Sequence, residues 1–191
     1  MSQSKPTDAT ASIEAIAKAA LTKEADALYQ MAAELPADFA GAVSGIIGAT
    51  GRVVVSGVGK SGHIGRKIAA TLASTGTPAY FVHGSEASHG DLGMVTADDI
   101  CILISNSGET TELRDITLYT RRFNIPLIAI SSNPESVLMQ AADYKLCLAK
   151  APEVCAIGKA QLCTGAFQQG LGNEQAKPHA FVSRPCGGIC L

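Results

Sequence analysis

The sequence contains no tryptophan and few other aromatic residues, and only 17% of its 191 residues are charged. Intrinsically disordered chains have a higher share of charged and polar residues, whereas 47% of this chain is hydrophobic. We therefore expect a globular domain of ordinary size with a large buried core. The net charge of -2 excludes a broad basic surface for nucleic acid or anionic lipid, although local donors can still bind a small anion.

Long apolar runs are also absent, since no uninterrupted hydrophobic segment reaches the length that crosses a membrane. The first ten residues, MSQSKPTDAT, are polar and lack the apolar stretch of a secretory signal peptide. We therefore expect a cytoplasmic protein with no membrane or nucleic-acid partner.

The six cysteines show no CxxC pair and no spacing typical of a zinc site. Two of them, Cys101 and Cys147, lie inside apolar runs and are expected to be buried packing residues. Reduced, non-catalytic thiols are therefore expected throughout, with no metal site. The six positions are Cys101, Cys147, Cys155, Cys163, Cys186 and Cys190.

Short apolar strands alternate with helical segments along most of the chain. An amphipathic helix is expected over 11–30, after a disordered tail at 1–10, and a second helical segment follows Pro36. This alternation predicts an α/β fold: a doubly wound, five-stranded parallel sheet of the flavodoxin-like or Rossmann-like kind, with N-terminal helices. The expected strands are 53–57, 78–82, 99–104, 126–130 and 144–148, and the helices between them are 64–75, 111–123 and 135–142.

The first strand ends in a glycine-rich loop, Gly57-Val58-Gly59-Lys60-Ser61-Gly62. Glycines let a backbone approach an anion closely, and the start of the next helix offers unpaired N–H groups. The spacing does not fit a P-loop, but it does match the bare dinucleotide fingerprint GxGxxG. No acidic residue near His83, at the end of the second strand, is placed to bind a ribose. Dinucleotide binding and a purely structural turn stay open as alternatives to phosphate binding.

The third strand ends in a second polar loop, Ser105-Asn106-Ser107-Gly108-Glu109-Thr110, just before a helix. Each of its hydroxyl and amide side chains can donate to a phosphate oxygen. The alternative is that Ser107 and Thr110 only cap the helix, although one serine would suffice for that. In a parallel sheet both loops lie at the carboxyl ends of the strands, where ligands bind.

A serine-rich loop ending in Gly-Glu-Thr resembles the phosphate loop of SIS domains, which handle phosphosugars. Three stretches resemble the arabinose 5-phosphate isomerases of that superfamily very closely: GVGKSGHIGRKIAATLASTGTPAYFVH, EASHGDLGM and ISNSGETTEL. The similarity extends from about Ile13 to Ala160. It implies isomerisation between ribulose 5-phosphate and arabinose 5-phosphate, without a cofactor, in a homo-oligomer, dimer or tetramer. The product of that reaction feeds synthesis of the octulosonic acid of lipopolysaccharide.

The same resemblance implies which residues act. The phosphate would be bound by Ser61, Ser105, Asn106, Ser107 and Thr110. The sugar carbons would be surrounded by Lys60, His89, Glu109 and Glu153. Isomerisation through an enediol needs a base for a carbon-bound proton, a polarising group at the sugar oxygens and a remote anchor, and these residue types supply all three.

Several of these residues have a plainer interpretation. Glu109 can simply favour the positive end of a helix dipole, and Lys60 can be a solvated turn residue. His89 lies in a polar loop beside Asp91, which either orients its ring or is an ordinary loop carboxylate. Glu153 would not be singled out without the resemblance.

The resemblance ends abruptly after Ala160. Family members continue with a Thr/Ser loop, a closing helix, a His-Pro-Gly-Gly motif and often a pair of cystathionine-β-synthase (CBS) modules, and none of these occurs here. We therefore expect an SIS domain over 11–160 and an atypical tail over 161–191, for which a frameshift or misjoined end is the hypothesis. Two other functions stay open: a non-catalytic sugar-phosphate-binding regulator and a different phosphosugar isomerase.

Overall fold

The computed structural model describes residues 8–149, of which residues 8–30 belong to one compact unit and residues 31–149 to a second. The helix α1 spans Asp8–Ala33 and so begins three residues before the expected start at Ala11. The first seven residues, the predicted tail over 161–191 and Glu153 lie outside the described residues. None of the described helices is long and apolar enough to span a membrane.

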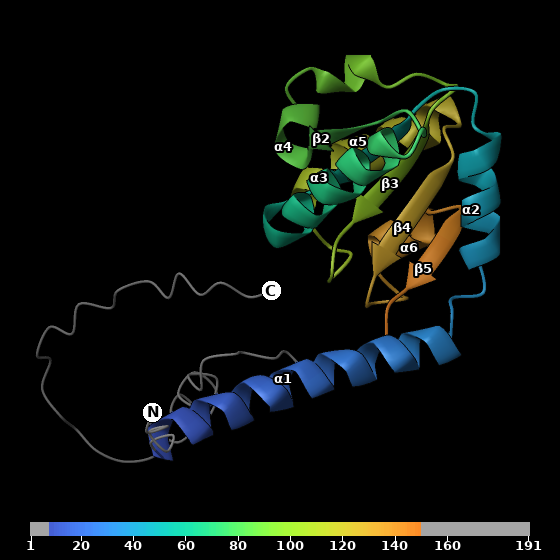
Figure 1. The fold of residues 1–191 in the computed structure, drawn as a ribbon. Coiled ribbons are helices and arrows are strands. Elements are labelled where there is room, and N and C mark those ends of the chain that lie inside the picture. Colours follow the sequence, from blue (N-terminus) through green and yellow to red (C-terminus); the bar gives the residue numbers. More distant parts are fainter. Residues whose placement is uncertain (1–7, 150–191) are drawn as a thin grey trace, which may run out of the picture. The chain divides into compact units, whose positions relative to one another are not determined.

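Five parallel strands form one sheet in the order β2-β1-β3-β4-β5 (Figure 1). Each strand begins and ends within one residue of its expected bounds, because a buried parallel strand is a continuous apolar run that the sequence displays directly. The strands are β1 Val53–Gly57, β2 Ala79–His83, β3 Ile100–Ile104, β4 Leu127–Ser131 and β5 Tyr144–Cys147.

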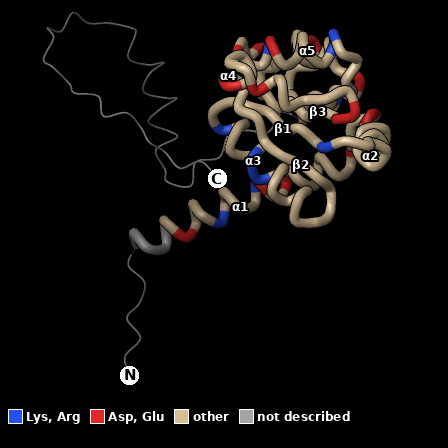
Figure 2. Tube along the Cα trace, turned by 90° about the horizontal axis from the view of Figure 1, so that it is seen from above, with Lys and Arg blue, Asp and Glu red and all other residues tan. Residues whose placement is uncertain are grey.

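Helices cover both faces of the sheet, which confirms the doubly wound fold. On one face Val54, Cys101 and Leu127 pack in a core with residues of α4, α5 and α6, whereas on the other Val53 and Val55 pack against α2 and α3. The central strands β1 and β3 carry no charged residue, as the uncoloured trace in Figure 2 shows. The helices are α2 Phe39–Gly48, α3 Gly59–Ser74, α4 Gly84–Ala87, α5 Arg114–Phe123 and α6 Val137–Ala141.

Three local predictions need correction. The helix α3 starts at Gly59 rather than Ile64, so the expected glycine turn is already its first turn. The segment after β2, expected to be a polar loop, contains α4 and a 3-10 turn, η1 Asp91–Met94. A second 3-10 turn, η2 Thr111–Leu113, precedes α5. Short helices of this kind have too few residues to produce a periodic apolar pattern, so tertiary packing decides them.

The two described cysteines differ in environment. Cys101 is buried as expected, and burial raises the pKa of its thiol to about 12. Cys147 is only partly buried, so the prediction that it is buried is wrong, although its side chain does pack against the core. It ends β5, which is an edge strand with a neighbour on one side only.

Candidate functional site

The two loops singled out in the sequence meet where the strand order of the sheet reverses. Strands β1 and β3 are direct neighbours, and Gly57 at the end of β1 pairs with Ile104 at the end of β3. The chain leaves β1 for α3 on one face and leaves β3 for α5 on the other, which opens a crevice between the two connections. Ligands of open α/β sheets bind at such a point, so the topology brings both candidate loops to one site.

The first loop turns tightly because two glycines face each other. A Cβ atom on Gly62 would lie 2.9 Å from the backbone oxygen of Gly57, so a larger side chain would force the turn open. Lys60 and Ser61 therefore lie in the first turn of α3, where backbone N–H groups lack intrahelical acceptors. No acidic residue lies in that turn, and the Lys60 side chain is exposed. This end of α3 favours an anion.

The second loop is held in shape by its own hydroxyl groups. Ser105 is only 3% exposed, and its Oγ accepts a 3.0 Å hydrogen bond from the Gly108 N–H. The same Oγ lies 2.7 Å from the Oγ1 atom of Thr110, so the two hydroxyls are hydrogen-bonded. Gly108 itself has a φ of 69°, a conformation that favours glycine. The structure thus brings together the two ends of the loop, Ser105 and Thr110.

The remaining phosphate-binding candidates of this loop are exposed. The side chains of Asn106 and Ser107 face solvent, while the Asn106 carbonyl accepts hydrogen bonds from Ser132 N–H and from the hydroxyls of Ser131 and Ser132. Ser107 Oγ accepts a 3.2 Å hydrogen bond from the Glu109 N–H. Thr110 precedes η2, but its side chain makes no capping hydrogen bond there. Helix capping therefore does not account for Thr110.

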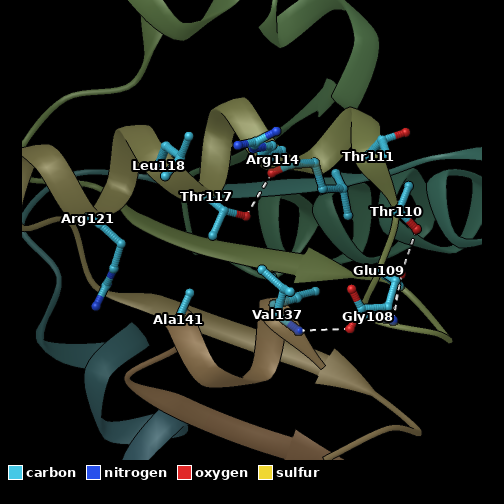
Figure 3. A pocket seen from close by; sticks show the side chains of 13 residues that line it. Gly108, Glu109, Thr110, Thr111, Arg114, Thr117, Leu118, Arg121, Val137 and Ala141 are labelled. Carbon is cyan, nitrogen blue, oxygen red and sulfur yellow. Dashed lines mark hydrogen bonds between the residues drawn. The ribbon is translucent and has the colours of Figure 1, made fainter. Parts of the chain in front are cut away.

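The carboxylate of Glu109 is bound to the helix α6. Its Oε1 accepts a 3.0 Å hydrogen bond from the backbone N–H of Val137, and Figure 3 shows the two residues facing each other. The sequence offered two interpretations of Glu109, a catalytic group or a partner of its own helix dipole. The structure gives it a third environment, because its partner is the start of a different helix.

The histidine predicted for the site lies in the turn after α4. The His89 side chain is exposed, and its backbone N–H donates to the Glu86 carbonyl at 2.9 Å. No hydrogen bond joins it to Asp91 within residues 8–149, which favours the second of the two interpretations of Asp91, an ordinary loop carboxylate. Asp91 instead begins the turn η1, which continues the chain away from α4.

Two residues at the same end of the sheet were missed in the sequence. His83, which pairs with Gly57 at the end of β2, accepts a hydrogen bond on Nδ1 from the Ser85 N–H at 3.3 Å. The pKa of the Glu112 carboxyl, in η2, is lowered mainly by a hydrogen bond from its own backbone N–H and then by one from the Thr111 hydroxyl. The neighbouring His83 makes a smaller electrostatic contribution in the same direction. His83 ends β2 and Glu112 follows β3, so both lie at the carboxyl end of the sheet, which was the signal that could have found them.

A cavity of about 460 Å³ lies behind the second loop, between α5 and α6 (Figure 3). Ser105, Glu109 and Thr110 contribute to its wall, and apolar side chains such as Leu118 and Val137 line much of the rest. Over residues 8–149 no cluster of three or more His, Cys, Asp or Glu side chains is arranged to hold a metal ion.

Comparison with known protein families matches residues 46–167 to the SIS domain. The chain belongs to the SIS domain family. The match includes both candidate loops, Gly57 to Gly62 and Ser105 to Thr110, and the sheet that presents them.

Curated relatives of this SIS domain include arabinose 5-phosphate isomerases named KdsD. The Yersinia pestis protein is 52% identical and the Shigella flexneri protein 49% identical, each over 143 residues that make up 75% of this chain. The aligned part makes up 44% of each relative, so the chain spans less than half the length of these proteins.

A solved structure from E. coli CFT073, in complex with arabinose 5-phosphate, also resembles this SIS domain. Its TM-score is 0.72 and its sequence identity 39%, and the match covers 85% of this chain and 86% of that chain. The Vibrio vulnificus NanR protein complexed with ManNAc-6P has a TM-score of 0.65 over 82% of this chain and 63% of that chain, but is only 18% identical and so shares the fold alone.

Proposed function

We propose that this SIS domain is an arabinose 5-phosphate isomerase, which interconverts D-ribulose 5-phosphate and D-arabinose 5-phosphate. The observation that carries the proposal is the pre-formed hydroxyl loop of Ser105 and Thr110 beside the first turn of α3, at the strand-order reversal. Identity of about half to the KdsD isomerases supports the same substrate. The similar structure that contains arabinose 5-phosphate supports a sugar phosphate as ligand.

The phosphate is held by Ser61, Ser105, Asn106, Ser107 and Thr110. Because Ser105 Oγ already accepts the Gly108 N–H, its own proton can go to Thr110 Oγ1. Thr110 then has its hydroxyl proton free to donate to a phosphate oxygen. Pre-formed donors of this kind avoid the cost of ordering the loop when the substrate binds.

The isomerisation moves one proton between C1 and C2 of the sugar. From ribulose 5-phosphate, a base removes a proton from C1, the electron pair forms the C1–C2 double bond of the enediol, and the C2 oxygen takes up a proton. In the second half the C1 hydroxyl gives up its proton and becomes the aldehyde, while the electron pair of the double bond takes up a proton at C2. This gives the aldose, so atoms and electrons balance without a cofactor. His89 and Glu153 are the candidate proton carriers, and the Lys60 ammonium stabilises negative charge on the sugar oxygens.

The protein is further proposed to be a cytoplasmic homo-oligomer whose product serves octulosonic acid and lipopolysaccharide synthesis. Two alternatives remain to be separated from this function. A sugar-phosphate-binding regulator would bind the substrate without converting it. Another phosphosugar isomerase would prefer a different member of a substrate panel.

The deciding experiment is incubation of the purified chain with ribulose 5-phosphate, with arabinose 5-phosphate followed by NMR. Lys60→Ala and His89→Ala variants are measured beside it. Turnover that both variants lose supports the isomerase. A folded protein that binds ribulose 5-phosphate without turnover supports the regulator, and faster turnover of a hexulose 6-phosphate or sedoheptulose 7-phosphate supports the third function.

A further inference from the structure

We propose that Glu109 is a positioning residue, which holds the phosphate loop in shape by binding the first N–H group of α6. This inference deepens the proposed isomerase function and rests on it. It replaces the expectation that Glu109 acts on the sugar carbons. Its basis is the 3.0 Å hydrogen bond from the Val137 N–H to Glu109 Oε1 (Figure 3).

The phosphate loop accepts hydrogen bonds from the first two backbone N–H groups of α6. The first three N–H groups of a helix have no acceptor within the helix. In α6 the Val137 N–H donates to Glu109, the Leu138 N–H donates to the Gly108 carbonyl at 3.2 Å, and the Met139 N–H donates to the Ser136 hydroxyl. Two successive residues of the loop thus satisfy two successive donors of the helix.

The other end of the loop is fixed to the same connection. The Asn106 carbonyl accepts hydrogen bonds from the Ser132 N–H at 3.1 Å and from the Ser132 hydroxyl at 2.8 Å. Ser131 and Ser136 also pack against Gly108 so closely that no Cβ atom fits there. The segment between β4 and α6 therefore supports the phosphate loop through contacts at Asn106 and Gly108.

Glu109 is the loop residue that contacts α6 through its side chain rather than through its backbone. It directly precedes Thr110, whose hydroxyl is proposed to donate to the phosphate. Releasing Glu109 from α6 frees the backbone at Thr110 and loosens the phosphate contact. Because the effect passes through the phosphate anchor, it falls on substrate binding rather than on proton transfer.

The test compares Glu109→Ala, Glu109→Gln and Val137→Pro with Glu135→Ala as the matched control. Glu135 is an exposed carboxylate in the same connection, and within the described residues 8–149 its side chain accepts no hydrogen bond. Val137→Pro removes the donor itself. Proline is favoured at the first position of a helix, and the preceding Ser136 has a ψ of 156°, which suits a residue before proline.

Glu109→Ala is expected to raise KM for ribulose 5-phosphate about tenfold, with kcat within about twofold of the wild type. Glu109→Gln, which keeps an oxygen acceptor, is expected to restore most of the affinity. Val137→Pro should raise KM as Glu109→Ala does. The double variant Glu109→Ala/Val137→Pro should have a KM no higher than that of the more affected single variant, because both substitutions remove the same hydrogen bond. The pH profile of kcat should not move. A Glu109→Gln variant that loses kcat while KM is unchanged overturns the proposal in favour of a base.

Amide hydrogen exchange at Gly108 and Leu138 separates this inference from the proposed function. Both N–H groups lie in the supported contacts and report on the loop whether or not the chain turns over substrate. If the wild type neither binds nor converts ribulose 5-phosphate, the isomerase proposal fails. Faster exchange in Glu109→Ala and Val137→Pro, but not in Glu135→Ala, still supports the positioning role. Unchanged exchange in both variants overturns it.

Discussion

The hydroxyl groups of Ser105 and Thr110 lie 2.7 Å apart, and this hydrogen bond closes the phosphate loop. Ser105 is buried at the end of a central strand, whereas Thr110 is only partly buried at the start of η2. The buried Ser105 thus orients the hydroxyl of the more accessible Thr110, which is the arrangement that a pre-formed anion site requires.

Replacing Thr110 by valine tests this arrangement, since valine has nearly the same shape and no hydroxyl. We expect KM for ribulose 5-phosphate to rise about tenfold or more, because a charge-assisted hydrogen bond to phosphate contributes ~1.5–3 kcal/mol. The measurement is steady-state kinetics, or calorimetric binding of arabinose 5-phosphate. Thr110→Ser keeps the hydroxyl and should stay near the wild type; equal losses in both variants would contradict the role of the donor.

Replacing Gly108, the glycine of the phosphate loop, is expected to destabilise the fold. Alanine there must adopt a φ of 69° and place its Cβ atom against the Ser136 side chain. The left-handed conformation costs ~1–2 kcal/mol and the overpacking ~1–3 kcal/mol, so we expect a loss of about 3 kcal/mol in the free energy of unfolding. Urea denaturation measures it. Gly48→Ala is the control, because within the described part of the chain no non-neighbouring atom lies within 4 Å of a Cβ there. A similar loss in both variants would refute the steric argument.

Asp143 is expected to make the fold sensitive to acid. Its hydrogen bond with Arg121, and then that from the Leu127 N–H, hold the pKa of the Asp143 carboxyl below its ordinary 3.8. Because the folded pKa is depressed, the stabilisation is present above pH 3.8 and is lost as the pH falls through the lower folded value.

Asp143→Asn should therefore lose about 1 kcal/mol or less at neutral pH, since the ion pair is largely exposed. The loss should shrink as the pH falls below 3.8, where the carboxyl of the unfolded chain becomes protonated, and should vanish below the lower pKa of the folded wild type. Thermal unfolding followed from pH 7 to pH 3 measures this, and a loss that is constant over the whole range would argue against the assigned cause.

Tyr80 is expected to limit stability at high pH. Burial raises the pKa of its phenol to about 12, although Arg52 opposes the shift, and its hydroxyl donates to the Met94 carbonyl at 2.8 Å. A raised folded pKa means that the stabilisation is present below the ordinary value of 10 and is lost as the pH rises through about 12. As the pH rises from 10 to about 12, the free energy of unfolding should therefore fall less in Tyr80→Phe than in the wild type. Tyr29→Phe, at a side chain that is 76% exposed, should behave as the wild type does.

Much of the fold could be predicted because its signals are local. Runs such as Val53-Val54-Val55 and Ile100-Cys101-Ile102 are apolar throughout, as a strand with two covered faces must be, and their spacing requires helices as crossovers. The glycine turn after β1 and the hydroxyl loop after β3 follow directly from strand ends. Those signals led to the two loops that the structure places together.

The partners of the site residues could not be predicted in this way. Glu109 and Val137 are 28 positions apart, and nothing near either residue indicates that a carboxylate on one loop binds the start of α6. The segment at the end of β2, with His83 and Gly84, likewise lies near Glu112 only because β2 is the neighbour of β1 in the sheet. The start of α3 depends on the tight approach of Gly57 and Gly62.

The class of fold, the strands and the two loops that can bind a phosphate follow from the sequence, because hydrophobic periodicity and glycine content act over a few neighbouring residues. The hydrogen bond between Ser105 and Thr110 joins residues only five positions apart, but the contacts that support their loop come from tertiary structure. The contacts of Glu109 with Val137 and of Asn106 with Ser131 join residues that are distant in the chain, and the packing of β4 and α6 beside β3 brings them within hydrogen-bonding distance.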